Sequence, residues 1–124
     1  MKKKIKRVYV AGLLTPRGIK STNPAIEYLI NISDLVDASL DLIEAGYTPF
    51  CPALDFLYFI KMKKRITEPM IKRLSKDWLE VSDAILLTHQ WQKSPGTLAE
   101  LEYAKKNYIP SFESIEELKK YDGE

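Results

Sequence analysis

The chain has 124 residues, the length of one domain, and a domain of this size buries roughly two-thirds of the surface that its unfolded chain exposes. Hydrophobic residues make up 45% of the sequence and charged residues 29%, which excludes a disordered or fibrous class. The net charge of +2 comes largely from basic runs at residues 2–7 and 61–65. Because no nucleic-acid-binding motif accompanies these runs, we expect solvated faces and no nucleic-acid partner.

The amino-terminal segment MKKKIKRVYVAGLL has a basic start and an apolar run, as a signal peptide has. The run is short and β-branched, however, and TPRG follows it instead of a small-residue cleavage site. We interpret residues 1–4 as a basic tail before a buried strand that ends near Gly12. No apolar run reaches the roughly 18 residues of a membrane span. We therefore expect a cytoplasmic protein without a membrane partner.

Strand and helix patterns alternate along the rest of the chain. Apolar residues recur at helical spacing from Asn23 to Ala45, and Gly46 follows at the usual place of a C-terminal cap. The runs YTPFCP, DAILLT and IPSF predict strands, whereas residues 70–81, GTLAELEYAKKN and SIEELKKY predict helices. Residues 53–69 give conflicting signals and predict either a short helix or a variable loop. The alternation favours one α/β domain over residues 1–124, with a parallel sheet and helices on both faces.

In such a sheet the ligand site lies beyond the carboxyl ends of the strands, where KSPGTLAE follows the third predicted strand. One interpretation is helix initiation, with Ser94 as N-cap, Pro95 in the first turn, and Thr97 and Glu100 as a capping box. The other is an active site. Ser94, Gly96 and Thr97 would then bind a phosphate at the helix N-terminus, and Glu100 would act on a sugar as a nucleophile or as a stabilising charge.

Several motifs occur together in one order: VYVAG before an arginine-containing loop, then AGYTPFCP, WLEVSDAILL and W-x-x-S-x-G-T-x-x-E-x-x-x-A. This combination resembles the nucleoside 2-deoxyribosyltransferase superfamily over most of the chain, apart from residues 53–69 and the tail. The branches that it resembles most are the 2'-deoxynucleoside 5'-monophosphate N-glycosidases and a related group of small proteins. The resemblance implies a flavodoxin-like or Rossmann-like three-layer sandwich with a parallel sheet of roughly four or five strands.

The resemblance also implies cleavage of an N-glycosidic bond through a covalent sugar intermediate on Glu100. Tyr9 would orient that carboxylate by a hydrogen bond, although a strand aromatic packed in the core is an equal alternative. Gly12 would let the backbone approach the ligand, or is a simple turn glycine. No metal or other cofactor is expected. The single cysteine, Cys51, excludes an internal disulfide and a multi-cysteine metal site.

Two positions bear on the substrate. Ser94 matches a position that is aspartate in the nucleoside transferases and serine in the nucleotide N-glycosidases. A carboxylate repels phosphate, whereas a hydroxyl at a helix N-terminus donates to it. Arg17 resembles a phosphate-contacting arginine of the nucleotide branch, or is a solvated loop charge. Together the two residues favour a nucleoside 5'-monophosphate over a free nucleoside.

One position departs from the resemblance, because Ser75 stands where the superfamily has an aspartate on the base side. Asp77 cannot replace it, since two residues along a helix turn a side chain by about 200°. Either another group such as Asp55 protonates the leaving base, or the protein binds a nucleotide without cleaving it. Trp91 and His89 lie in the predicted loop THQWQKSPGT, which follows the third predicted strand. There Trp91 either stacks on the base or packs over the loop hinge.

We therefore expect an N-glycosidase that acts on a (deoxy)nucleoside 5'-monophosphate. The alternatives are a nucleoside deoxyribosyltransferase, a non-catalytic nucleotide-binding or sensing module, and an accessory domain on the same fold. The resemblance further implies a homo-oligomer, a dimer or higher, because members of the superfamily complete their sites with a neighbouring subunit. The segment FLYFIKM is the candidate contact, with coverage of the core as an equal alternative.

Overall fold

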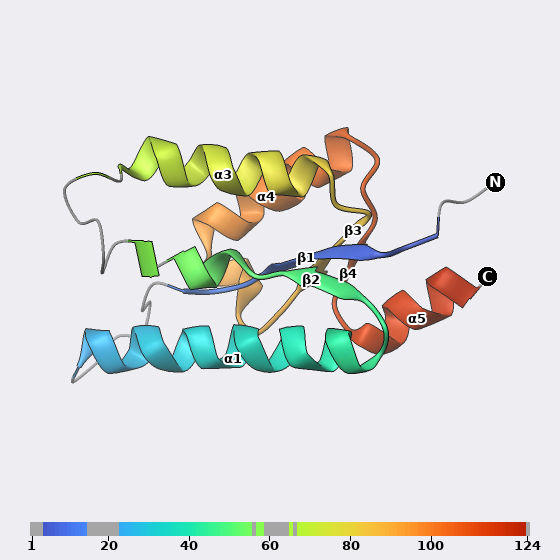
Figure 1. Ribbon diagram of the computed structural model, residues 1–124, viewed down its shortest axis with the longest axis horizontal. Helices are drawn as coiled ribbons and strands as arrows, with labels where there is room; N and C mark the ends of the chain where they lie inside the picture. The colour runs from blue at the N-terminus through green and yellow to red at the C-terminus, as the bar shows by residue number, and fades with distance from the viewer. Residues whose placement is uncertain (1–3, 15–22, 56, 59–64, 66, 124) are drawn as a thin grey trace.

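The computed structural model describes residues 4–14, 23–55, 57–58, 65 and 67–123 (Figure 1). Arg17 and most of the segment 56–66 lie outside this part of the chain. The regular elements are, in order, β1 (Arg7–Ala11), α1 (Pro24–Glu44), β2 (Thr48–Phe50), η1 (Pro52–Asp55), α3 (Glu68–Glu80), β3 (Ala84–Leu87), η2 (Trp91–Lys93), α4 (Pro95–Lys106), β4 (Ser111–Phe112) and α5 (Ile115–Gly123).

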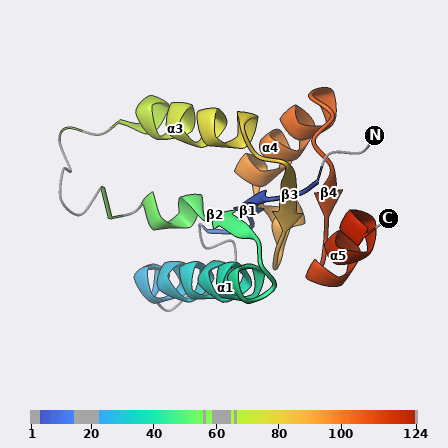
Figure 2. The ribbon, with the colours of Figure 1, turned by 45° about the vertical axis from the view of Figure 1, so that its right-hand side comes forward.

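The strands form one sheet of four strands in the order β2-β1-β3-β4, and each neighbouring pair is parallel. Helices α1 and α5 cover one face of this sheet, and α3 and α4 cover the other (Figures 1 and 2). The predicted α/β three-layer sandwich is confirmed. Among the described helices, none combines the length and the apolar character that a membrane crossing requires.

Alternation along β1 divides the core into two layers. Val8 and Val10 point toward α1 and α5, whereas Tyr9 and Ala11 point toward α3 and α4. Both sides are buried because helices cover both faces, as expected for a central parallel strand. Tyr9 therefore reaches, from the middle of the sheet, the face on which α4 lies.

The ends of α1 follow the sequence signals. The side chain of Asn23 caps the helix by accepting hydrogen bonds from the backbone N–H groups of Ala25 and Ile26. At the other end, Gly46 has a φ of +94°, in the left-handed region that favours glycine after a helix. The predicted helix from Asn23 to Ala45 is thus confirmed to within a residue at each end.

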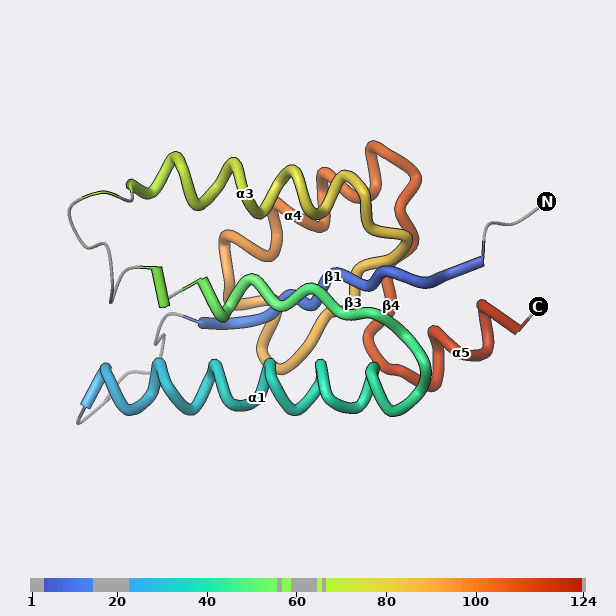
Figure 3. Tube along the Cα trace, in the orientation of Figure 1, coloured from blue at the N-terminus to red at the C-terminus, as the bar shows by residue number. Residues whose placement is uncertain are grey.

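The amino end of the sheet is closed by structural contacts. Asp83, just before β3, accepts hydrogen bonds of 2.9 Å from the backbone N–H groups of Lys6 and Arg7. On α5, Asp122 accepts from the Ile5 N–H at 3.0 Å and from the Tyr47 hydroxyl at 3.1 Å, so this helix returns to the amino end of β1 (Figure 3). The opposite, carboxyl end of the sheet is where ligands bind in folds of this kind.

Candidate active site

A cavity of about 740 Å³ lies at the carboxyl ends of the strands. The chain moves from β1 to β2 on one side and onward to β3 on the other, so the cavity lies at the point where strand order reverses. Its volume falls within the range of small-ligand sites. Its walls come from the end of β1, from α3 and from the start of α4, and its polar lining includes Gly12, Ser75, Ser94, Gly96, Thr97 and Glu100.

The central contact of this cavity is a hydrogen bond from the Tyr9 hydroxyl to Oε2 of Glu100. The Tyr9 side chain is fully buried, since β1 is a central strand and Tyr9 faces α4. Glu100 lies in the second turn of α4 and lines the cavity. The hydrogen bond that the resemblance implied between these residues is therefore present.

The surroundings of this pair change the acidity of both groups. Burial raises the pKa of Glu100 to about 7, and the hydrogen bond from Tyr9 offsets only part of this rise. Burial, followed by the negative charge of Glu100, raises the pKa of Tyr9 far above its ordinary value. Tyr9 thus stays a hydrogen-bond donor at neutral pH, while Glu100 is present as both acid and carboxylate.

The start of α4 shows which residues of the segment 94–100 serve as helix caps. Oγ of Ser94 accepts from the backbone N–H of Thr97 at 3.2 Å, and Pro95 is the first helical residue, so the predicted N-cap is confirmed. The predicted capping box of Thr97 and Glu100 is wrong. The Thr97 hydroxyl instead donates to the carbonyl oxygen of Gly12 at 3.2 Å, and Glu100 contacts Tyr9. Helix initiation therefore explains Ser94 but not Glu100.

Two donors remain at the tip of α4. Ser94 uses its oxygen for the cap, which leaves its hydroxyl proton free to donate. The Gly96 N–H has no hydrogen-bond acceptor within the described ranges, as expected in the first turn of a helix. A Cβ on Gly96 would meet only Oγ of Ser94, at 3.9 Å, so the space beside it is open. The tip thus presents a hydroxyl and an amide donor at the cavity.

Gly12 lines the cavity, but its packing explains why a glycine stands there. A Cβ on Gly12 would overlap Oγ1 of Thr88 and would lie 3.0 Å from Cδ2 of Leu35. The Thr88 hydroxyl is held in this place because it donates to the carbonyl oxygen of Ala11 at 3.0 Å. Packing against Thr88 therefore explains the glycine, and the side chain of Thr88 fills the space that we expected a ligand to use.

Helix α3 brings two lysines to the cavity that the sequence analysis missed. Lys72 and Lys76 are spaced as i and i+4, and both line the cavity. Nζ of Lys72 lies 3.2 Å from the Glu68 carboxylate, and Nζ of Lys76 lies 5.7 Å from the ring centroid of Tyr103. Their spacing of four residues on a predicted helix was the sequence signal that could have placed the two lysines on one face. Glu68 lines the same wall and offsets the charge of Lys72, so Lys76 supplies the net positive charge of this wall, which attracts anions.

Ser75 lies between the two lysines in sequence and also lines the cavity. A hydrogen bond between its side chain and Tyr9 acts on the Tyr9 pKa in the downward direction, although burial outweighs it. Ser75 is therefore next to the Tyr9 and Glu100 pair, as its place in the resemblance implied. It brings a hydroxyl there and no carboxyl group.

Asp55 ends η1, just beyond β2, and its neighbours Pro52 and Ala53 line the cavity. The charge of Asp55 makes the smallest contribution to the raised pKa of Tyr9, and Asp55 itself is not among the residues that line the cavity. Oδ2 of Asp55 is buried and has no hydrogen-bond partner in the described part of the chain. Burial also raises the pKa of Asp55.

Trp91 does not line the cavity. Its indole N–H donates to Oε1 of Glu113 at 3.1 Å, and its ring packs against the core layer between the sheet and α4. The predicted stacking on a base is therefore not supported by its position. The alternative interpretation, packing over the loop hinge, agrees with these contacts.

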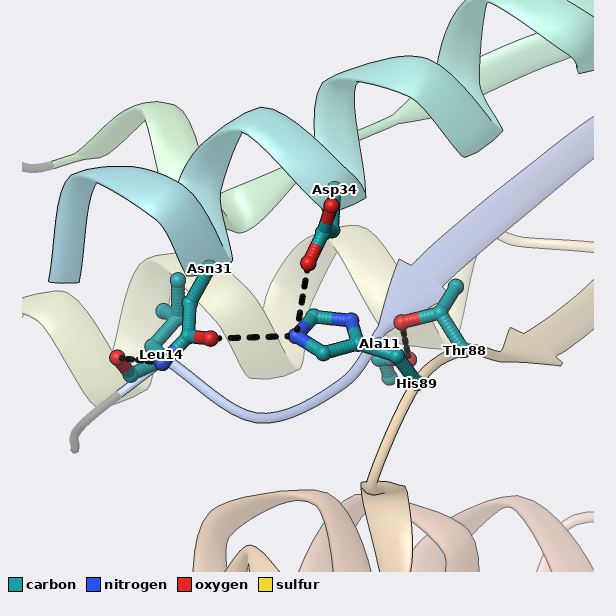
Figure 4. A network of polar contacts seen from close by, with 6 residues as sticks. All are labelled: Ala11, Leu14, Asn31, Asp34, Thr88 and His89. Carbon is teal, nitrogen blue, oxygen red and sulfur yellow. Dashed lines mark hydrogen bonds and ion pairs between the residues drawn. The ribbon is translucent and has the colours of Figure 1, made fainter. Parts of the chain in front are cut away.

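His89 also points away from the cavity, toward α1 (Figure 4). Its Nε2 lies 3.2 Å from Oδ1 of Asn31 and 3.6 Å from Oδ2 of Asp34. The Asn31 amide in turn donates to the carbonyl oxygen of Leu14 at 2.8 Å. This network joins the loop after β3 to α1 and to the segment after β1, so His89 holds the cavity's supporting loops together.

Two further findings concern cysteine reactivity and metal binding. Cys51 is buried in the core layer beneath α1, and burial raises the pKa of its thiol, which makes the thiolate scarce. Among the residues that the structure describes, no group of three or more His, Cys, Asp or Glu side chains is arranged to hold a metal ion.

A comparison with protein-family models matches residues 6–111 to the family described as a domain of unknown function, DUF4406. The chain belongs to this family. No curated protein and no solved structure matched the chain. The matched span includes every residue that lines the cavity, so the candidate site is part of the DUF4406 domain itself.

Proposed function

We propose that this DUF4406 domain is an N-glycosidase that cleaves the bond between base and sugar in a (deoxy)nucleoside 5'-monophosphate. The observation that carries the proposal is the position of Glu100. Its carboxyl group is partly buried on the wall of the cavity, contacts Tyr9, and lies one helical turn from the donors at the tip of α4. A buried carboxyl group is costly, and helix capping does not account for it.

The proposed reaction begins with attack of the Glu100 carboxylate on C1' of the sugar. The bond between C1' and the base nitrogen breaks, the electron pair leaves with the base, and the base takes up a proton. A water molecule then attacks C1', which releases the sugar phosphate and regenerates the carboxylate. Tyr9 orients the attacking oxygen by donating to Oε2 of Glu100, which restricts the carboxylate to one rotamer.

The start of α4 supports a phosphorylated substrate. Gly96 and Glu100 are four residues apart, about 6 Å along the helix axis, which is the scale of one sugar ring. A 5'-phosphate at the Gly96 N–H and the Ser94 hydroxyl would then leave C1' near Glu100. On α3, Lys76 adds a positive charge at the cavity, whereas Glu68 offsets the charge of Lys72. Arg17 stays a predicted phosphate contact, since it lies outside the described residues.

A second candidate is a nucleotide-binding or sensing module that does not cleave its ligand. Ser75 favours it, because this residue brings no carboxyl group to the position beside Tyr9 from which a leaving base would take a proton. A third outcome, transfer of the sugar to an acceptor base, shares the first half of the proposed reaction. It differs only in whether a base or water resolves the intermediate.

The test is release of free base from ribo- and deoxyribonucleoside 5'-monophosphates and from the matching nucleosides, followed by chromatography with and without an acceptor base. Glu100→Gln is the test variant. Glu102→Gln is the matched control, because Glu102 is exposed on the same helix and pairs with Lys106 at 3.2 Å. We expect phosphate-dependent release that Glu100→Gln abolishes and Glu102→Gln leaves unchanged. Tight nucleotide binding without release from any substrate would favour the sensing module.

The proposed homo-oligomer has a candidate contact surface. Leu57 and Tyr58, within the segment expected to form it, are 55% and 51% exposed, and Leu54 just before them is 45% exposed. Exposed apolar side chains grouped in this way are typical of contact surfaces. Light scattering of the wild type and of a Leu57→Glu variant tests this, with a lower mass expected for the variant. A monomeric wild type would contradict it.

A further inference from the structure

Helix α1 is apolar on two sides. Its inner side packs in the core through Ile32, Leu35 and Leu42. On its outer side, five large apolar side chains are each between 50% and 55% exposed, namely Ile26, Leu29, Ile30, Leu40 and Ile43. The helix lies along the outside of the molecule, with the sheet on one side of it (Figures 1 and 2). Because a surface helix normally has one apolar stripe, the second one indicates a docking surface.

The outer apolar residues have the spacing of a helix that packs along another helix. Alternating steps of three and four residues define a line that we call the outer stripe, which consists of Ile26, Leu29, Ser33, Val36, Leu40 and Ile43. This repeat is the seam of a coiled coil. The outer stripe is about 26 Å long at the rise of an α-helix. Two helices in contact over this length bury on the order of 1,000 Å², where specific interfaces begin.

Charge narrows the choice of partner. Helix α1 contains no lysine or arginine and five carboxylates, which are Glu27, Asp34, Asp37, Asp41 and Glu44. None of these carboxylates belongs to the outer stripe. A membrane surface is a poor partner, because helices that lie on anionic lipid carry lysine and arginine on their polar face. The partner must therefore offer an apolar seam that keeps its own carboxylates away from those of α1.

The outer stripe is complementary to itself when two copies of α1 run antiparallel. Ile26 then meets Ile43 of the second copy across the seam. Leu29 meets Leu40 of the second copy in the same way. Ser33 lies near the centre, where its small side chain allows the two helices to approach closely. The seam between the two copies thus contains large apolar pairs and no charged residue.

The same arrangement keeps the carboxylates apart. Asp37 lies beside Ile30 of the second copy and not beside another acid. Glu44 comes next to the N-terminus of the second α1, where the positive end of the helix dipole stabilises a carboxylate. A parallel pair would instead bring together two C-terminal ends, each with Asp41 and Glu44. Charge therefore favours the antiparallel pair.

We propose that a second copy of this chain covers the outer stripe, so that two α1 helices form an antiparallel pair about a two-fold axis. The proposal goes beyond the proposed reaction, since no residue of the outer stripe lines the cavity. It deepens the proposed homo-oligomer, on which it rests, by giving it a contact surface separate from Leu57 and Tyr58.

Crosslinking at single cysteines tests the pairing. Leu29→Cys with a purification tag and untagged Leu40→Cys would be co-expressed, purified and treated with a short bismaleimide. We expect a tagged–untagged pair as the main product, because these positions meet across the seam. Each variant alone should crosslink at least about 5-fold less, since its two cysteines lie about 16 Å apart in the antiparallel pair. The wild type is the control, because its single cysteine, Cys51, is buried.

A charge in the seam provides a second measurement. Leu40→Glu should lower the mass found by light scattering to about half that of the wild type. It should still unfold cooperatively, because Leu40 is half exposed in the single chain. Leu98→Glu, at a leucine of α4 that is 45% exposed, is the control and should keep the mass of the wild type.

Three results would overturn the inference. Crosslinking of either cysteine variant alone that equals or exceeds that of the mixture would exclude the antiparallel pair. An oligomer that Leu57→Glu separates and Leu40→Glu does not would keep the proposed homo-oligomer but remove α1 from its contact. A monomeric wild type would overturn both proposals, and a cationic helix of another protein would then be the expected occupant of the outer stripe.

Discussion

The Tyr9 hydroxyl donates a hydrogen bond to Glu100 across the boundary between β1 and α4. The two residues are 91 positions apart in sequence, so the contact depends on how the helix packs against the sheet. Neither residue needs the other for its own element, since Ser94 caps α4 and the sheet buries Tyr9 in any case. The pair is therefore best explained by what it does at the cavity.

The first prediction concerns the stability cost of Glu100. Its pKa is about 7 in the folded state, compared with 4.5 as the ordinary value, so the folded state binds more protons between these pH values and loses stability as pH rises. This amounts to roughly 2 to 3 kcal/mol between pH 5 and pH 8. Glu100→Gln does not titrate and should gain that much relative to the wild type over this interval, as measured by urea unfolding.

A matched control separates this effect from a general change in charge. Glu102→Gln removes an exposed carboxylate from the same helix and should follow the wild type at both pH values. A stability difference between Glu100→Gln and the wild type that stays constant from pH 5 to pH 8 would show that Glu100 is ionised normally. The proposed nucleophile would then lack its distinctive environment.

The second prediction concerns Tyr9→Phe. The hydroxyl lowers the pKa of Glu100, so its removal should move that pKa upward and shift the acidic limb of kcat/KM to higher pH. The loss of one hydrogen bond should also lower the free energy of unfolding by about 1 kcal/mol. A pH profile recorded with a nucleotide substrate is the measurement. An unshifted limb with the same loss of stability would assign Tyr9 a packing role alone.

The third prediction concerns phosphate preference and uses Ser94→Asp. Aspartate caps a helix as well as serine does, so the melting temperature should stay within a few degrees of the wild type. Its carboxylate, however, should repel the 5'-phosphate, and kcat/KM should fall at least about 10-fold for nucleotides relative to the matching nucleosides. An unchanged ratio would mean that the phosphate binds elsewhere, for example along α3 beside Lys76.

The fourth prediction contrasts two glycines of the cavity. Gly12→Ala should destabilise the fold by about 1 to 3 kcal/mol, because its Cβ would overlap the Thr88 hydroxyl. Gly96→Ala should leave stability unchanged or slightly higher, because its Cβ meets open space, yet it should weaken nucleotide binding at the tip of α4. Thermal unfolding and nucleotide titration check both. Equal affinities for the wild type and Gly96→Ala would remove the tip of α4 from the phosphate site.

A double variant identifies the cause of the Gly12 effect. Replacing Thr88 by alanine removes the hydroxyl oxygen that the new methyl group of Gly12→Ala would overlap. The double variant should then lose less stability than the sum of the two single losses. Strict additivity would mean that backbone conformation, and not this contact, explains the glycine.

Much of the fold could be predicted from sequence because its signals are local. The cap at Asn23, the left-handed Gly46 and the N-cap at Ser94 each depend on residues within one helical turn, and all three agree with the structure. Strand order could not be obtained in this way. The parallel pairing of β1 with β3 joins segments that lie far apart along the chain, with α1, β2 and α3 between them.

The residues whose interpretation changed all have distant partners. Thr97 looks like a helix cap in sequence, but its hydroxyl donates to Gly12, 85 positions away. Trp91 belongs to the expected loop, but its indole N–H bonds to Glu113, beyond α4. In each case local sequence predicted the correct element, and the side chain followed contacts that only the folded chain brings together.

The most direct test of the account is to trap the proposed intermediate on Glu100. The wild type would be incubated with a 2'-fluorinated nucleoside 5'-monophosphate, since the fluorine slows breakdown of a glycosyl-enzyme, and the intact protein would then be weighed by mass spectrometry. We predict an added mass of one fluorinated sugar phosphate on the peptide that contains Glu100, and none in Glu100→Gln. Release of the base with no adduct, or an adduct on another residue, would contradict the account.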